Sequence, residues 1–219
     1  MGIKISQGYF ISPPIVLNGL VLAIDAANST SYVNGSTLWK DVSSNNNTGT
    51  LINTPTYTEL VGKTLYFTTN EYVNYTGVDI GTTHSVELWV YPTITNSGRW
   101  MASTDSYYFD INGSDITFNI NTSPRTTSNS GIQIGNWNHC VFVRDNTSYT
   151  VYVNGSQIDT GNNAAWDGIG FTLKNIAADS INGYYAEGYL SMVKAYNRTI
   201  SYDEVLQNYN AHKFRFGLP

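Results

Sequence analysis

The segment from Trp137 to Gln157, WNHCVFVRDNTSYTVYVNGSQ, decides the fold, because it reads as an antiparallel hairpin followed by a second tight turn. Residues 137–144 alternate between two faces with a period of two, which is typical of a β-strand. Residues 145–148 have turn-forming side chains, and the alternation resumes at Tyr149. It ends at Asn154-Gly155, where both residues tolerate the positive φ of a type I′ turn. This pattern predicts a β-sandwich.

Length and composition agree with a single all-β domain. A chain of 219 residues can bury one substantial core, and sandwiches of this size commonly form one domain. Charged residues are only 12% of the chain, against about 25% in ordinary soluble domains, and the formal net charge is −5. Nucleic-acid binding needs clustered Lys and Arg, so we expect no nucleic-acid partner. No basic start followed by a long apolar run opens the chain, so we expect neither a secretory signal nor a membrane partner.

The single cysteine, Cys140, lies in the middle of a predicted strand and has no intrachain partner for a disulfide. We interpret it as a small core residue. The alternative is a reactive thiol, because His139 and Arg144 lie nearby in the sequence and a basic neighbourhood favours the thiolate.

The first 18 residues differ from the rest of the chain. They are dense in apolar and aromatic side chains, and Pro13-Pro14 imposes an extended backbone that forbids a helix. An apolar arm is poorly solvated, so we expect it to dock against the domain or a neighbouring subunit. An additional edge strand of the same domain is the alternative. The residues assigned to this anchoring arm are Ile3, Ile5, Tyr9, Phe10, Ile11, Pro13 and Pro14.

Several stretches resemble one known fold family. Residues 137–157 resemble the late strands of concanavalin A-like, laminin G-like jelly rolls, and SVELWVYPT (residues 85–93) resembles their central strand. The opening GLVLAIDAANSTSY (19–32) with LWKDVSSNNNTGTLINTPTY (38–57) resembles laminin G-like domains in structural proteins of tailed bacteriophages. The end, AYNRTISYDEVLQNYNAHKFRFGL (195–218), resembles the terminal strand and helix of the same domains.

The resemblance implies an all-β, two-sheet antiparallel jelly-roll sandwich over residues 19–219, with one short C-terminal helix at about 201–212. Ser201 and Glu204 have the spacing of a capping box, which supports a helix start there. Other strands are expected at residues 20–24, 64–68, 72–75, 84–91, 100–103, 107–111, 116–120 and 188–196, with turns at Asn96–Gly98 and Asn112-Gly113.

Metal and cofactor binding have little support in the sequence. Relatives in this family commonly show a Gly and an Asp where this chain has Thr69 and Glu71, which puts a bound cation in doubt. Oxygen ligands for calcium could come from Asp25, Asn28, Asp41, Asn70 and Asp79, but these residues form no dense acidic loop and are typical of turns. The three histidines, His84, His139 and His212, are far apart in sequence and outside any zinc motif. We therefore expect no cofactor, with calcium as the alternative.

Catalytic residues are also not evident. Jelly rolls of this class include glycoside hydrolases, which need two carboxylates about 5–9.5 Å apart. No glutamate has a second carboxylate two positions away on an evident strand, a comparison that covers Glu59, Glu71, Glu87, Glu187 and Glu204. We expect a non-enzymatic protein, although carboxylates from different strands could still meet.

Glycan recognition needs an exposed aromatic platform with planar polar side chains beside it. Trp166, in a loop rich in Asn and Gly, is the best single candidate for such a platform. The alternative is that the aromatic rings proposed for this platform cover the core or a subunit contact. The remaining candidates are Tyr107, Tyr108, Tyr184 and Tyr185.

The resemblance implies a virion structural protein of a phage, and within that context the short chain and the absence of shaft repeats favour a capsid role. We expect a capsid decoration or head-fibre protein on the virion surface, made in the host cytoplasm, forming a homo-oligomer and bound through residues 1–18 to the major capsid protein or another virion protein. The alternative is a carbohydrate-binding receptor module of a tail or fibre tip, with a host glycan as its partner.

Overall fold

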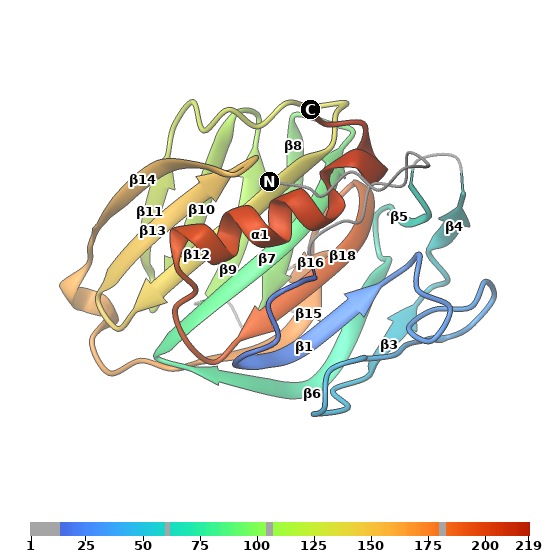
Figure 1. The fold of residues 1–219 in the computed structure, drawn as a ribbon, viewed down its shortest axis with the longest axis horizontal. Helices are drawn as coiled ribbons and strands as arrows, with labels where there is room; N and C mark the ends of the chain where they lie inside the picture. The colour runs from blue at the N-terminus through green and yellow to red at the C-terminus, as the bar shows by residue number, and fades with distance from the viewer. Residues whose placement is uncertain (1–13, 60–61, 104–106, 180–182) are drawn as a thin grey trace, which may run out of the picture.

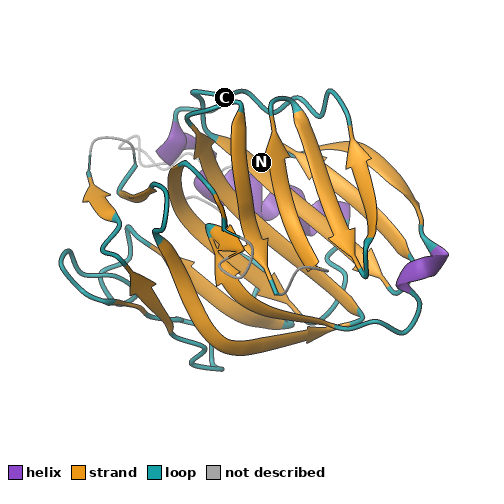
Figure 2. Ribbon diagram, turned by 180° about the vertical axis from the view of Figure 1, so that it is seen from behind, coloured by secondary structure: helices purple, strands orange, loops and turns teal. Residues whose placement is uncertain are grey.

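The computed structural model describes residues 14–59, 62–103, 107–179 and 183–219. Two antiparallel eight-stranded sheets pack face to face, and one helix covers the outer side of one sheet (Figure 1). We call the sheet beneath the helix the front sheet and the other sheet, which faces the viewer in Figure 2, the back sheet. The fold expected from the sequence is therefore confirmed.

The strands of the front sheet are β1 (Leu20–Asp25), β4 (Thr56–Thr58), β5 (Thr64–Phe67), β7 (Thr83–Pro92), β12 (Asn138–Asp145), β13 (Ser148–Val153), β14 (Ser156–Asn162) and β18 (Gly188–Tyr196). The strands of the back sheet are β2 (Leu38–Trp39), β3 (Gly49–Ile52), β6 (Tyr72–Gly81), β8 (Asn96–Ala102), β9 (Tyr107–Asn112), β10 (Asp115–Ile120), β11 (Ser123–Thr127) and β15 (Phe171–Ile176). A separate hairpin and three helical segments complete the fold: β16 (Ala178–Asp179), β17 (Tyr184–Tyr185), η1 (Ala164–Trp166), α1 (Tyr202–His212) and η2 (Lys213–Phe216). Within the described residues, no helix has the length and apolar character needed to cross a bilayer.

The hairpin predicted from residues 137–157 is present as β12 and β13. Its two strands pair in register from Asp145 and Ser148 to Cys140 and Val153, and the chain turns again at Asn154-Gly155 into β14. Both turn residues have positive φ, 50° at Asn154 and 78° at Gly155, as a type I′ turn requires. Residues 138–144 are buried on both faces, because one face lies in the core and the other lies under the helix.

One predicted turn is wrong. Residues Asn96–Gly98 belong to strand β8, where the register shifts between Asn96 and Gly98. Gly98 has φ +75°, so the glycine signal that resembles a turn instead marks a β-bulge inside a strand. Strand β6 is also longer than expected. Strands β11 and β15 had no clear signal, because β11 (SPRTT) has no aliphatic or aromatic side chain and the apolar alternation of β15 (FTLKNI) stops at Asn175.

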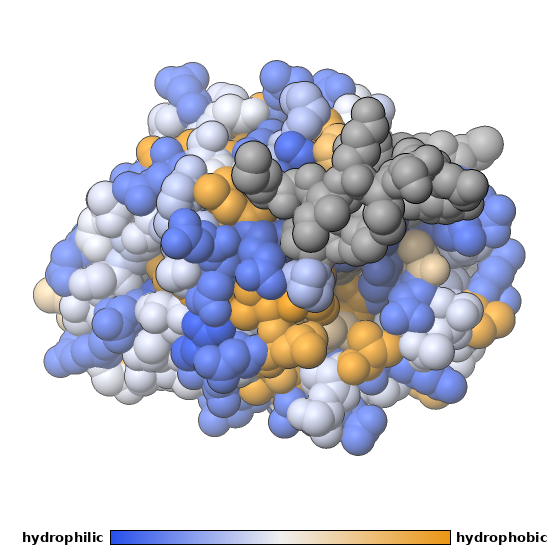
Figure 3. All heavy atoms as spheres, viewed as in Figure 1, coloured by the Kyte–Doolittle hydropathy of each residue, from blue (hydrophilic) through white to orange (hydrophobic). Residues whose placement is uncertain are grey.

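The outer edge of β1 is covered by the asparagine-rich loop that follows β2. Asp41 Oδ1 accepts a hydrogen bond from the Ala23 amide at 2.8 Å, and the Val42 amide donates to the Ala23 carbonyl at 2.8 Å. Asn47 Nδ2 donates to the Val21 carbonyl, also at 2.8 Å. Apolar side chains gather over β1 on the front face (Figure 3). The backbone groups that β1 would offer to another strand are thus satisfied by its own chain.

Helix α1 begins as the sequence predicts. The Ser201 side chain accepts from the Glu204 amide and the Glu204 carboxylate accepts from the Ser201 amide, which completes the capping box. The helix lies across β12, β7 and β18 (Figure 1). Val205 and Tyr209 are buried against this sheet.

A buried polar network joins the front sheet to α1. Glu87 Oε1 accepts from Lys194 Nζ at 2.7 Å, Glu87 Oε2 accepts from Asn208 Nδ2 at 2.6 Å, and both charged side chains are at most 2% exposed. The same Asn208 amide donates to the Tyr196 hydroxyl. Burial alone would raise the pKa of Glu87, but Lys194 and His139 hold this pKa well below its usual value.

Residues 14–18 dock onto the same region. The Val16 amide donates to Asn208 Oδ1 at 2.8 Å, and the Tyr196 hydroxyl donates to the Val16 carbonyl at 3.2 Å. Gln207 Nε2 donates to the Pro14 carbonyl at 2.6 Å. This short segment joins no sheet, so the edge-strand alternative does not apply to it. The other predicted arm residues lie outside the described residues: Ile3, Ile5, Tyr9, Phe10, Ile11 and Pro13.

Candidate functional site

The candidate site lies on the outer face of the back sheet, where strand β9 exposes Tyr108. Residues alternate along β9, so that Tyr107, Phe109 and Ile111 are buried in the core while Tyr108 and Asp110 are only partly buried on the other face. This alternation is the ordinary consequence of a period of two in a strand. Tyr108 therefore lies on a rigid surface, as a platform residue should.

Arg99 of β8 lies between two tyrosine rings on this face. Its guanidinium carbon is 3.8 Å from the ring centroid of Tyr108 and 4.2 Å from that of Tyr184. Arg99 also forms an ion pair with Asp179 of β16, whose side chain is fully buried. A guanidinium plane that is stacked and paired in this way fixes the position of both rings.

The hairpin β16–β17 adds two more tyrosines to the site. Tyr184 is 54% exposed, and Tyr185 packs against Tyr72 of β6 with ring centroids 6.3 Å apart. The hairpin packs against β8 at Gly98, where a side chain would collide with the Tyr185 carbonyl oxygen. We call Tyr72, Tyr108, Tyr184 and Tyr185 the tyrosine strip.

Buried polar atoms without partners lie next to the strip. Among the described residues, no hydrogen-bond partner exists for Arg99 Nε, Asp110 Oδ1 or Asn119 Oδ1. Asp110 is paired in register with Arg99 on one side, and Asn119 is paired with Tyr108. Burial raises the pKa of Asp110, and the nearby Arg99 only partly offsets this effect. Unsatisfied polar atoms of this kind are often found at functional sites.

Trp166, the best platform candidate from the sequence, is not on the surface. Its side chain is fully buried, Nε1 donates to the Ser123 carbonyl at 2.9 Å, and the ring packs against Phe142 and Tyr149. The Asn163 side chain caps η1, the short helix that contains Trp166. A loop position rich in Asn and Gly therefore does not imply exposure, and Trp166 is a core residue.

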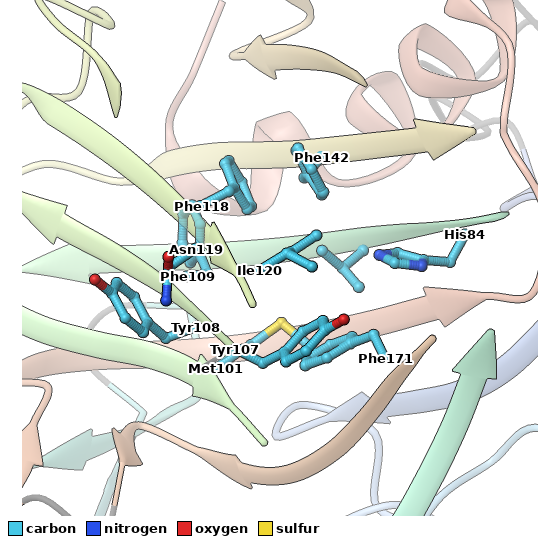
Figure 4. Close-up of a pocket in the computed structure, with 11 residues that line it drawn as sticks. His84, Met101, Tyr107, Tyr108, Phe109, Phe118, Asn119, Ile120, Phe142 and Phe171 are labelled. Carbon is cyan, nitrogen blue, oxygen red and sulfur yellow. The ribbon is translucent and has the colours of Figure 1, made fainter. Parts of the chain in front are cut away.

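Tyr107 is also buried, at 8% exposure, and stacks on Phe171 with ring centroids 5.4 Å apart. Figure 4 shows Tyr107 and Phe171 beside a space between the sheets, whereas the Tyr108 hydroxyl points in the opposite direction. This space is about 20 Å³, enough for about one water molecule. His84 lines it, and burial lowers the pKa of His84 to about 3, so its ring is neutral at neutral pH. This space is too small for a saccharide.

A second concave region lies at the edge of the sandwich, with a volume of about 270 Å³. Two tyrosines, Tyr32 and Tyr57, lie within it with ring centroids 5.5 Å apart. The other lining residues are Asn34, Gly35, Ser36, Thr37, Leu51, Thr54, Pro55 and Thr56, none of which is charged. Its walls come from loops together with Leu51 of β3 and with Thr56 and Tyr57 of β4, whereas the tyrosine strip lies on strands of the back sheet and on the packed hairpin.

The oxygen ligands considered for calcium are engaged in structural contacts. Asp25 pairs with Arg215 at 2.8 Å, Asp41 accepts backbone amides at the edge of β1, and Asp79 accepts the Gly81 amide. The remaining two residues, Asn28 and Asn70, lie in turns. Glu71, which replaces the aspartate expected from the resemblance, accepts the Thr68 amide at 2.8 Å. Within the described ranges no three His, Cys, Asp or Glu residues come together as a metal site would require.

Residues with reactive side chains are in structural roles. Cys140 is a buried core residue, as predicted, and burial raises the pKa of its thiol. His139 Nε2 is 3.2 Å from Glu87 Oε1 inside the network under α1. Glu204 pairs with Arg198 at 2.6 Å. None of these groups faces the tyrosine strip.

The family model for the Concanavalin A-like lectin/glucanases superfamily matches residues 62–206 of the chain, about two thirds of its length. The chain belongs to this superfamily. The matched range includes every strand and tyrosine of the strip. No curated protein sequence matches the chain.

Several solved structures share this superfamily fold at low sequence identity. Domain 4 of AbnA, an extracellular GH43 arabinanase from Geobacillus stearothermophilus, solved in complex with arabinotriose, has a TM-score of 0.66 and 17% identity, with 88% of this chain and 98% of that chain covered. The binding domain of Paraclostridial Mosquitocidal Protein 1 has a TM-score of 0.69 and 15% identity, and that of botulinum neurotoxin serotype D has 0.67 and 13%. The match covers 92% of this chain but only 55% of each toxin domain. At these identities the similarity shows the fold alone.

Proposed function

We propose that the chain is a non-catalytic carbohydrate-binding module that holds a saccharide against the tyrosine strip. The observation that carries this proposal is the stacking of Arg99 between Tyr108 and Tyr184, which fixes two partly exposed rings on one face. Flat aromatic rings bind the apolar faces of sugar rings, and adjacent polar groups then orient the hydroxyls. The arabinanase domain that shares this fold was solved with arabinotriose, which supports a saccharide as the ligand class.

A binding measurement tests this proposal. Titration calorimetry should be done with the best ligand from a glycan array, for the wild type and for Tyr184→Ala and Tyr108→Ala. We expect each substitution to weaken binding about tenfold, because each removes one stacking surface worth about 1–2 kcal/mol. Tyr202→Ala is the matched control, since Tyr202 is 49% exposed but lies on α1. Equal affinity in the two strip variants and the control would contradict the proposal.

A second proposal concerns the virion. We propose that the module is displayed as a capsid decoration or head-fibre protein of a phage, as a homo-oligomer held by its first residues to the major capsid protein or another virion protein. The specific support is that residues 14–18 are fixed under α1 by three hydrogen bonds, so the chain before them starts from a defined place. The phage context depends on the sequence motifs alone and stays a prediction.

Deletion of residues 1–13 tests the second proposal without disturbing the docked segment. We expect the truncated chain to fold with an unchanged circular dichroism spectrum and melting temperature, and to be lost from purified particles, which is measured by immunoblotting. Incorporation of the truncated chain at the wild-type level would show that these residues are not the anchor. Saccharide binding by the same variant serves as the functional control.

A further inference from the structure

The electrostatic balance around the tyrosine strip points to the class of saccharide. This step depends on the proposed carbohydrate binding. We propose that the strip selects uncharged saccharides and rejects those that carry carboxylate or sulfate groups.

The cation in the site is already neutralised. Arg99 is the residue that an acidic sugar would be expected to pair with, because a guanidinium binds carboxylate and sulfate oxygens in a bidentate manner. Its Nη1 instead donates to Asp179, and its guanidinium carbon lies over the rings of both Tyr108 and Tyr184. The side chains of Arg99 and Asp179 are only 11% and 1% exposed, so water screens this pair weakly. The Arg99–Asp179 pair is therefore neutral as a whole.

A second carboxylate makes the net charge of the site negative. Asp110 lies directly across from Arg99 in the β8–β9 pairing, on the same face. The site thus contains two carboxylates, Asp110 and Asp179, against one guanidinium. The neighbouring cation on β15, Lys174, donates to the Thr76 carbonyl. An anionic ligand at the strip would meet net repulsion.

Two of the three unpartnered atoms lead to the same selection, and the third, Arg99 Nε, belongs to the guanidinium that is paired with Asp179. Asp110 Oδ1 and Asn119 Oδ1 are acceptors without a donor among the described residues. A sugar hydroxyl donates a hydrogen bond, either directly or through one water molecule, whereas an ionised carboxylate or sulfate group only accepts. A neutral, hydroxyl-rich ligand satisfies these oxygens, and an acidic ligand adds acceptors where acceptors are already in excess.

Matched pairs of oligosaccharides test the inference in the wild type. One pair is galactotriose with trigalacturonate, and the other is lactose with sialyllactose. Both pairs are included in an array of neutral and acidic glycans, and the affinities of the glycans that bind are then measured by calorimetry. We expect the neutral member of any bound pair, and the neutral glycans of the array, to bind at least about tenfold more tightly than the acidic ones. A preference for acidic members overturns this inference and leaves the proposed function intact. Failure to bind any member of the array contradicts the proposed function and the inference with it.

Charge variants of the strip sharpen the test. Asp179→Asn keeps a hydrogen-bond acceptor for Arg99 but removes the neutralising charge, and Asp110→Asn removes the second carboxylate. We expect each to raise the ratio of acidic to neutral affinity about tenfold. Asp203→Asn changes the net charge equally but lies exposed on α1, so its ratio should equal that of the wild type. If Asp179→Asn disturbs the hairpin, Asp110→Asn still tests the inference. An unchanged ratio of acidic to neutral affinity in a folded Asp110→Asn variant overturns it.

Discussion

Replacing Lys194 with methionine is expected to lower the free energy of unfolding by about 3–5 kcal/mol, the usual cost of removing one partner of a buried ion pair. Lys194 and Glu87 are 2% and 1% exposed and joined at 2.7 Å beneath α1. Methionine is similar in length, so little volume is lost. The cost comes from the Glu87 carboxylate, which stays buried without its cation. Urea denaturation at pH 7 measures the effect.

The pH dependence separates this electrostatic cost from a packing defect. In the wild type, Lys194 helps to hold the pKa of Glu87 low. Without Lys194, burial raises this pKa above the unfolded value of about 4.3, so the variant loses stability as the pH rises through the raised pKa. The difference between wild type and variant should therefore be largest near pH 7 and become smaller near pH 4. A difference that does not change with pH would indicate lost packing instead.

The double variant Lys194→Met/Glu87→Leu is the control for the pair. It removes both charges, and buried ion pairs replaced by apolar groups are often neutral in stability. We expect it to be more stable than Lys194→Met alone. Asn208 would lose its acceptor in Glu87 but retain the Tyr196 hydroxyl and the Val16 amide as partners. A double variant less stable than the single one would contradict this account.

Replacing Trp166 with alanine is expected to destabilise the domain by about 3–5 kcal/mol, the range for a buried tryptophan. The ring is fully buried, contacts Phe142 and Tyr149, and donates its Nε1 hydrogen to the Ser123 carbonyl. The substitution leaves a large cavity and removes one of the two side-chain hydrogen bonds to the Ser123 carbonyl, which keeps Asn163 Nδ2 as a donor. Thermal and urea unfolding measure the loss.

Two further variants distinguish a core role of Trp166 from a role in saccharide binding. Trp166→Phe should recover part of the loss, because it fills most of the cavity but cannot donate to Ser123. Tyr184→Ala, at the half-exposed strip, should change stability much less than Trp166→Ala. Saccharide affinity should instead be lowered by Tyr184→Ala, whereas the affinity of the folded Trp166→Phe variant should be close to that of the wild type. Loss of affinity in Trp166→Phe with full stability would place Trp166 in the site after all.

The sandwich could be predicted because its signals are local. The period-two pattern of 137–144, the Asn154-Gly155 turn and the Ser201 capping box each act within a few residues and agree with the structure. The exception is Asn96–Gly98, since a glycine with positive φ occurs in bulges as well as in turns. The sequence alone does not separate these two cases.

The candidate site could be predicted only in part, because exposure depends on tertiary packing. The sequence indicated Tyr108, Tyr184 and Tyr185, but it placed Trp166 and Tyr107 beside them, and burial of both reverses that prediction. No feature of the sequence indicated that Arg99 belongs to the site. Its partners Tyr184 and Asp179 lie about eighty residues away, and no local pattern reports a contact across that separation.

The asparagine-rich loop along β1 has a consequence for how many copies can be crowded together. A bare strand edge is a template on which a second molecule can add, and this addition leads to aggregates. Here Asp41, Asn45 and Asn47 bind the backbone of residues 20–23 in place of a foreign strand. Copies displayed at high density could not pair with one another through that edge.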